Sequence, residues 1–157
     1  MTLSLPYTLA VFRGDSIRVA LEVTELEWIS SDQAVHVRAD IAIEGEGLTC
    51  GTLTELLDAE ELRTFQGFLD ELDRGRSATW EPSPKSAELD VELREHTVFD
   101  TVGVEPWVTV KPYGVGLVVG GVVSFDDDWF EEAYARFDTL QDHLEQLRSS
   151  SVSDDRR

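Results

Sequence analysis

The chain has 157 residues, of which 41% are hydrophobic, and this length fits one domain that can bury a single core. Its 13 basic and 32 acidic side chains give a formal net charge of −19 at pH 7. A surface this negative repels phosphate backbones and anionic lipids, so composition argues against nucleic acid and membranes as partners. The acidity fits two explanations, which are hydration in concentrated salt and complementarity to a basic protein.

The sequence also indicates a compartment. Cys50 is the single cysteine, so we expect no internal disulfide, a reducing environment and a small buried side chain at this position. The N-terminal segment has no basic region before its apolar residues. The longest apolar run, GVGLVVGGVV at 114–123, is about half the length of a membrane helix. We therefore predict a cytoplasmic protein.

Two segments within the first 45 residues alternate apolar and polar side chains, which is typical of half-buried strands. In LAVFRGDSIRVALEV, residues 9–23, two apolar runs flank a turn that contains Gly14, the second run alternates, and this pattern predicts a hairpin. The segment AVHVRADIAIEG, residues 34–45, predicts a third strand.

Residues 58–74 change to a helical period. Asp58 can cap the first amides while Glu61 reaches back, and Gly75 stands where a helix would end. The apolar face of this predicted helix consists of Leu62, Phe65, Phe68, Leu69 and Leu72.

The second half returns to strands and closes with a helix. Strands are expected within SATWEPS (77–83), AELDVELREH (87–96), PWVTVK (106–111) and GLVVGGVVSF (116–125), the last buried in the middle of a sheet because both its faces are apolar. A helix is expected at about 128–148. We predict one α+β domain over 1–148, a mainly antiparallel sheet of about six or seven strands with two principal helices packed on it, and a disordered polar tail at 149–157.

The segment SFDDDWFEEAYARF, residues 124–137, contains the densest acidic cluster. Asp126, Asp127 and Asp128, followed by Glu131 and Glu132, favour a helix N-terminus, where carboxylates complement the free amides and the helix dipole. A calcium loop starting at Asp126 would need glycine at its sixth place, where Glu131 stands. A metal site completed by another strand and an acidic surface for a partner remain open alternatives.

Other candidate motifs are weak. The glycines of GVGLVVG do not open a helix, so bulges or a turn explain them better than a phosphate loop. His36, His96 and His143 are far apart, and no nucleophile elbow or paired-cysteine motif is present. The sequence therefore assigns no catalytic, cofactor-binding or metal residues, although an enzyme with a scattered site is a third alternative.

Two tryptophans next to carboxylates complete the predicted partner surface. An exposed Trp129 beside the aspartates, and an exposed Trp80 beside Glu81, would suit a binding hot spot for a basic partner. Packing at the edge of the core is the alternative for each indole. The candidate surface is thus Asp126, Asp127, Asp128, Trp129, Glu131, Glu132, Trp80 and Glu81.

The order of segments over roughly 14–147 resembles that of WapI-type bacterial immunity proteins and their actinobacterial relatives. The likeness lies in GDSIRVALEV, VHVRADIAIEGEGLTCG, LLDAEELRTFQGFLDELDRG, SATWEP, ELDVELREH and VVSFDDDWFEEAYARFDTLQDHLEQL. The resemblance implies a cognate-toxin inhibitor, and an acidic surface would suit a basic nuclease toxin. The alternative is a domain of a halophile or actinobacterium whose acidity serves hydration only. Neither the partner nor the oligomeric state follows from these residues.

Overall fold

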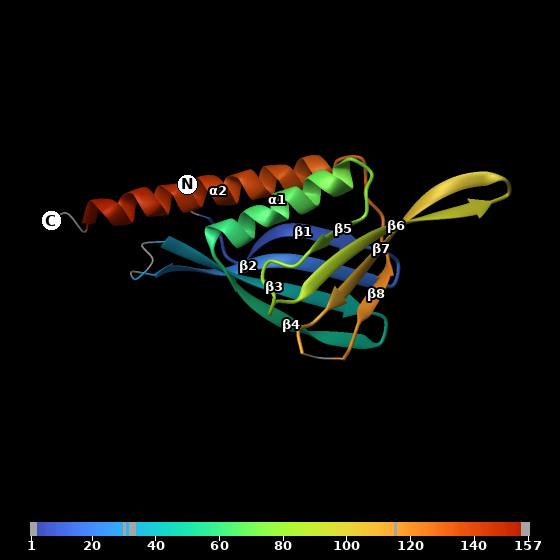
Figure 1. Ribbon diagram of the computed structural model, residues 1–157, viewed down its shortest axis with the longest axis horizontal. Helices are drawn as coiled ribbons and strands as arrows, with labels where there is room; N and C mark the ends of the chain where they lie inside the picture. Colours follow the sequence, from blue (N-terminus) through green and yellow to red (C-terminus); the bar gives the residue numbers. More distant parts are fainter. Residues whose placement is uncertain (1–2, 30, 32–33, 115, 155–157) are drawn as a thin grey trace.

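The computed structural model describes residues 3–29, 31, 34–114 and 116–154, without the side chains of 48–55 and 152–154. Over these residues the chain forms two helices and eight strands, which make two four-stranded antiparallel sheets (Figure 1). The predicted α+β class is confirmed. The strands are divided between two sheets, whereas the sequence led us to expect one.

The first sheet is a meander in which each strand pairs with the next along the chain. Pairing of Leu21 with Ile41 and of Val19 with Ile43 places these apolar side chains on one face, where all four are buried. This register confirms the predicted hairpin and third strand. The strands are β1 (Tyr7–Arg13), β2 (Ile17–Ile29), β3 (Ala34–Gly45) and β4 (Leu48–Leu57). Cys50 lies on β4, but its side chain is outside the described residues.

Helix α1 (Ala59–Asp73) begins and ends as the sequence predicts. The Asp58 carboxylate accepts hydrogen bonds from the amides of Glu60, at 2.9 Å, and Glu61, at 2.8 Å. The Glu61 carboxylate in turn accepts the Asp58 amide at 2.9 Å, which completes a capping box. Gly75 has a φ of 73°, the left-handed conformation that terminates helices.

The second sheet has the order β5-β6-β7-β8. Its strands are β5 (Ala78–Trp80), β6 (Glu88–Val98), β7 (Thr101–Lys111) and β8 (Val119–Val122). The expectation that 116–125 forms a central strand is wrong, because β8 has only four residues and lies at the edge of the sheet. The end of the run, with Gly121 and Val123 buried, forms a junction between the two sheets, whereas Leu117 and Val118 are exposed.

At that junction the β1–β2 turn abuts the end of β8. The Ser124 amide donates to the Arg13 carbonyl at 3.0 Å, which forms an isolated bridge between the sheets. A Cβ atom at Gly14 would lie 1.8 Å from the Val122 carbonyl oxygen, and one at Gly121 would lie 2.8 Å from Ile17 Cγ2. The two backbones approach closely because neither glycine has a side chain.

Helix α2 (Trp129–Asp154) continues beyond the predicted end at 148. Residues 149–154, which we expected to belong to a disordered tail, are helical. The hydroxyls of Ser149, Ser150 and Ser151 donate to the carbonyls four residues earlier at 2.9–3.0 Å, so these side chains are satisfied within the helix itself. Residues 155–157 of the predicted tail lie outside the described residues.

The two helices lie side by side on one face of the first sheet (Figure 1). Beneath them a chain of rings joins the elements, with Phe65 of α1 contacting Trp80 of β5 at 5.2 Å and Phe137 of α2 at 6.2 Å between centroids. Phe12 of β1 continues the cluster toward Phe68 and Trp129. Edge-to-face and tilted contacts of this kind add to the burial of these large side chains.

One hydrogen bond ties the helices together, and its loss should be measurable. The Tyr134 hydroxyl donates to the Asp70 carboxylate at 2.8 Å. Tyr134→Phe should lower the free energy of unfolding by about 1–2 kcal/mol, which chemical denaturation will measure.

The same bond gives a pH dependence. Partial burial, and then the Asp70 hydrogen bond, raise the pKa of Tyr134 above its usual value of 10.0. Stability from a raised pKa is complete below the unfolded pKa and is lost as pH rises through the folded one. The difference between the parent and Tyr134→Phe should therefore be constant below about pH 9 and shrink above about pH 10. A difference that grew with pH would contradict this assignment.

Candidate partner-binding surface

The three aspartates immediately precede α2. The Asp128 carbonyl accepts the Glu132 amide at 2.9 Å, so Asp128 occupies the N-cap position by its backbone. Among the described residues, no amide donates to the carboxylates of Asp126, Asp127 or Asp128, which are all exposed. These side chains can favour the helix through its dipole alone.

Because the Asp58 carboxylate accepts amide hydrogen bonds and the Asp128 carboxylate accepts none from the described residues, alanine substitution should destabilise the protein more at the start of α1 than at the start of α2. Asp58→Ala removes two hydrogen bonds to amides and should destabilise the protein by about 1–2 kcal/mol. Asp128→Ala removes only a charge near the helix dipole and should cost about 0.3–1 kcal/mol, less at high salt. Thermal denaturation of both variants across a salt series will measure the difference. Equal costs at every salt concentration would show that Asp128 caps α2 through its side chain.

The two predicted hot-spot tryptophans are largely buried. Trp129 is 9% exposed and donates its indole N–H to the Val11 carbonyl at 2.7 Å. Trp80 is 2% exposed and donates to the Thr64 hydroxyl at 2.9 Å. The expectation of exposed tryptophans is therefore corrected, because both rings belong to the aromatic core and their polar atoms find partners there.

Part of the acidic cluster borders a cleft of about 400 Å³ between the β1–β2 turn and the start of α2. Asp126, Trp129 and Glu132 line it, together with Arg13 and Arg136. Arg136 pairs with Glu132 at 3.0 Å, so the cleft carries charges of both signs. Of the predicted surface, Asp127, Asp128, Glu131, Trp80 and Glu81 are not among the lining residues that the structure describes.

Other potential sites are dispersed. His36 lies on β3, His96 on β6 and His143 on α2. Within the part of the chain that the structure describes, no group of three or more histidine, cysteine, aspartate or glutamate side chains is placed to hold a metal ion. Gly120 lies in β8, and Gly114 has the left-handed φ of a turn residue, 69°, as expected for strand and turn glycines. No described helix is both long and apolar enough to cross a membrane.

The surface that sequence reasoning missed is a two-stranded ribbon, residues 94–105, at the outer ends of β6 and β7. It projects from the body of the molecule (Figure 1). Strand β5 pairs with β6 only at 89–91, and β8 pairs with β7 only at 107–110. Within the described residues, the two halves of the ribbon therefore form a ladder only with each other. A lone hairpin of this kind is marginally stable in water.

One face of the ribbon continues the core face of the second sheet. Along β7, Val108 and Val110 are fully buried, and the same side of the strand carries Val104 and Val102, which are 58% and 65% exposed. Their cross-strand partners are Glu95 and Thr97. The apolar stripe of β7 therefore runs out of the core into solvent, where no described element covers it.

The tip of the ribbon is strained. Val98 pairs with Thr101, which leaves a two-residue loop of Phe99 and Asp100 with φ values of 49° and 63°. Two left-handed residues are typical of a type I′ turn, which prefers Asn-Gly. For a residue with a side chain this conformation costs about 1–2 kcal/mol. The Phe99 side chain is 98% exposed, so it gains no packing within this chain that would offset the strain.

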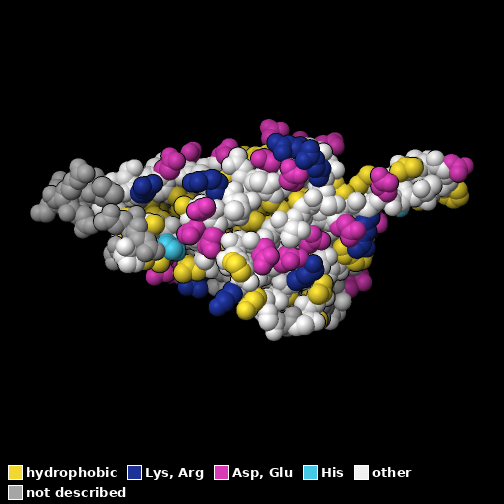
Figure 2. Space-filling model, viewed as in Figure 1, with side chains coloured by type: hydrophobic (Ala, Val, Ile, Leu, Met, Phe, Trp, Pro, Cys, Tyr) yellow, Lys and Arg dark blue, Asp and Glu magenta, His cyan; other side chains and the backbone are white. Residues whose placement is uncertain are grey.

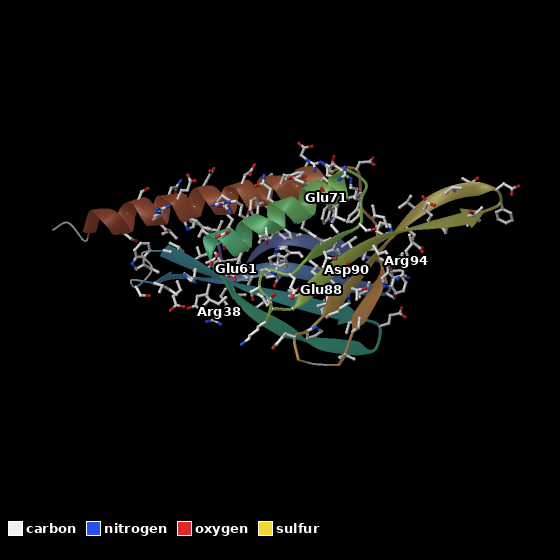
Figure 3. All side chains as sticks on the ribbon, viewed as in Figure 1. Arg38, Glu61, Glu71, Glu88, Asp90 and Arg94 are labelled. Carbon is white, nitrogen blue, oxygen red and sulfur yellow. The ribbon has the colours of Figure 1, made fainter. Side chains whose placement is uncertain are left out.

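The foot of the ribbon is held by Arg94, labelled in Figure 3. Its guanidinium lies 4.4 Å from the centroid of the Trp107 ring and 2.9 Å from the Glu92 carboxylate. Further toward the body, Glu88 pairs with Lys111 at 2.6 Å on the same face of β6. These contacts lie on the face of β6 and β7 opposite Val102 and Val104, whereas Glu95, the partner of Val104, lies on the same face as the valines.

The alternating valines of β7 were a partial signal for the ribbon in the sequence. Valines at 102, 104, 108 and 110 lie on one side of β7, but the turn lacks the glycine and asparagine that mark a tight hairpin. Phe99 and Asp100 therefore did not read as a turn in the sequence. Only the backbone geometry shows that the loop has two residues.

These features define the class: an acidic α+β domain with two sheets, two helices on one side and a projecting apolar ribbon. The chain belongs to a family of unknown function (DUF5959), whose model matches residues 7–145. This match spans both sheets, α1 and most of α2. Comparison with curated proteins and with solved structures gave no match.

Proposed function

We propose that this protein is a non-enzymatic binding protein that recognises a basic partner protein. One observation carries the proposal, which is the exposed apolar face of the ribbon. An apolar strand face left in water is unfavourable unless a partner covers it, and such surfaces mark interaction sites. The net charge of −19 favours a partner of opposite sign.

The more specific proposal is an immunity-type inhibitor of a basic toxin domain, such as a nuclease. Its support is the resemblance in segment order to WapI-type immunity proteins, together with the acidity of the chain. The exposed carboxylates of Asp126, Asp127, Asp128, Glu131 and Glu132 would then raise the rate of encounter with the toxin. Such an inhibitor acts inside the producing cell, so we propose a cytoplasmic location.

Affinity purification of the full chain from its native host tests the proposal. We expect one protein with a positive net charge to co-purify in a fixed ratio, and a weaker yield in the presence of salt. If that protein is a toxin, its expression alone should arrest growth, and co-expression of this chain should restore it. Recovery of only acidic proteins, or of no partner at stoichiometric amounts, would reject the proposal.

The distribution of charge favours a second candidate function, which is hydration in concentrated salt. On the face shown in Figure 2, acidic side chains are spread over the helices, the sheets and the ribbon, and basic side chains lie among them. A spread coat of carboxylates suits a solvated surface more than a single docking patch. Under this alternative, stability should increase steeply with salt up to molar concentrations, and no partner should be found.

A further inference from the structure

We infer that the ribbon, residues 94–105, enters an apolar groove on the basic partner, with Phe99 as its leading anchor and its carboxylates against a rim of lysine and arginine side chains. This inference rests on the proposed function, because it names the docking element and the partner's surface for the same binding activity. The partner's surface must be concave, because a narrow projection such as the ribbon can be covered on its faces only by a groove.

The valines of the ribbon indicate that the floor of the partner's groove is apolar. Val102 and Val104 continue the stripe that Val108 and Val110 begin inside the core, so the exposed residues are patterned for burial. The helices of this chain lie over the first sheet and leave the ribbon uncovered (Figure 1). A partner that covers the stripe would extend the core of this domain across the interface.

Charge selects the partner among the surfaces that could cover this face. The ribbon carries three carboxylates, at Glu95, Asp100 and Glu105, and one arginine, Arg94, which is already paired with Glu92. A second copy of this chain would bring the same carboxylates and a net charge of −19, so self-association is opposed. An anionic membrane is opposed for the same reason. A basic rim is the complementary surface.

The tip supplies the anchor. Phe99 has the left-handed φ that an asparagine or glycine would adopt with less strain, and its ring is 98% exposed. Phe99 therefore neither favours the turn conformation nor packs against the rest of this chain. Strain retained at an exposed aromatic side chain is accounted for if that side chain fills a pocket on a partner.

Site-specific crosslinking in the native host tests the placement of the ribbon. The full chain carries the photoreactive residue p-benzoylphenylalanine at position 99 and, as a matched control, at position 113. Tyr113 is also an exposed aromatic residue, at 58%, but it follows the opposite end of β7. We expect position 99, and not 113, to form an adduct with the co-purified basic protein, and the attached peptide to come from an apolar groove with basic residues at its edge.

Affinity measurements with the purified partner test the anchor and the rim. Phe99→Asn should weaken binding by roughly 30-fold or more, as expected for a hot spot, while Tyr113→Asn should change it by less than about twofold. Asparagine tolerates the left-handed conformation, so Phe99→Asn should melt at or above the parent temperature, which separates loss of contact from loss of fold. Glu105→Gln, on the face opposite the valines, should slow association several-fold at low salt and have no effect near 1 M salt.

The outcomes separate this inference from the proposed function. If a basic partner binds the full chain but crosslinks equally from 113, or binds Phe99→Asn as tightly as the parent, the ribbon is not the docking element and the proposed function stands. If position 99 crosslinks to a second copy of the chain, to an acidic protein or only to lipid, the inference is overturned. If no basic protein binds the full chain, both proposals fail.

Discussion

Phe65→Ala is expected to lower the free energy of unfolding by about 3–5 kcal/mol, the largest effect of any single substitution considered for this protein. Phe65 is completely buried and contacts Phe68, Trp80 and Phe137, which belong to α1, β5 and α2. Its removal leaves a cavity between the two helices and β5. For a domain of this size the melting temperature should fall by roughly 6–20 °C, measurable by calorimetry.

Phe99→Ala is the matched control for that change, because it deletes the same side chain from a position that is 98% exposed. It should leave the melting temperature within about 2 °C of the parent, since almost no buried surface is lost. The pair separates a phenylalanine that holds the fold from one that is available for binding. A loss of stability at position 99 comparable to that at 65 would mean that the ribbon tip packs against the body in solution.

Gly14→Ala is expected to cost about 3 kcal/mol, the upper end of the range for overpacked sites. Its Cβ atom would lie 1.8 Å from the Val122 carbonyl oxygen. That oxygen belongs to the backbone, so it cannot move aside by a change of side-chain rotamer. The β1–β2 turn and β8 would have to separate, which weakens the Ser124–Arg13 bridge between the sheets. Urea denaturation will report the change in unfolding free energy.

Gly67→Ala provides a control of opposite sign. Gly67 lies on the exposed face of α1, and a Cβ atom there would meet no heavy atom within 4 Å. Alanine should therefore stabilise the helix by about 0.8–1 kcal/mol. If Gly14→Ala were also neutral or stabilising, the close approach of the two sheets would not persist in solution.

Local physics explains how much of the fold could be predicted. The alternation in β2 and β3, the apolar spacing of α1 and the capping box at Asp58 depend on neighbours within a few residues, and each was predicted from the sequence and found. The end of α2 was less predictable, because the serines at 149–151 are poor helix formers whose hydroxyls are satisfied only once the helix exists.

The candidate surface was less predictable, because burial and pairing depend on residues far apart in the chain. An exposed hot spot and packing at the core edge were both open for Trp129, and the structure decides for packing, because its indole N–H donates to the Val11 carbonyl, 118 residues away. The apolar run at 116–125 resembled a central strand, but β8 lies at an edge, and the approach of Ile17 accounts only for the glycine at 121.

By itself, the sequence determined the α+β class, the first hairpin, the helix start at Asp58 and a strongly acidic surface, because composition and short-range periodicity express these directly. The tertiary structure alone decided that the strands divide into two sheets, that Trp80 and Trp129 are core residues and that Val102 and Val104 emerge from the body uncovered. The physical reason is that a strand's alternation shows which face is apolar, whereas whether that face is covered depends on where the rest of the chain packs.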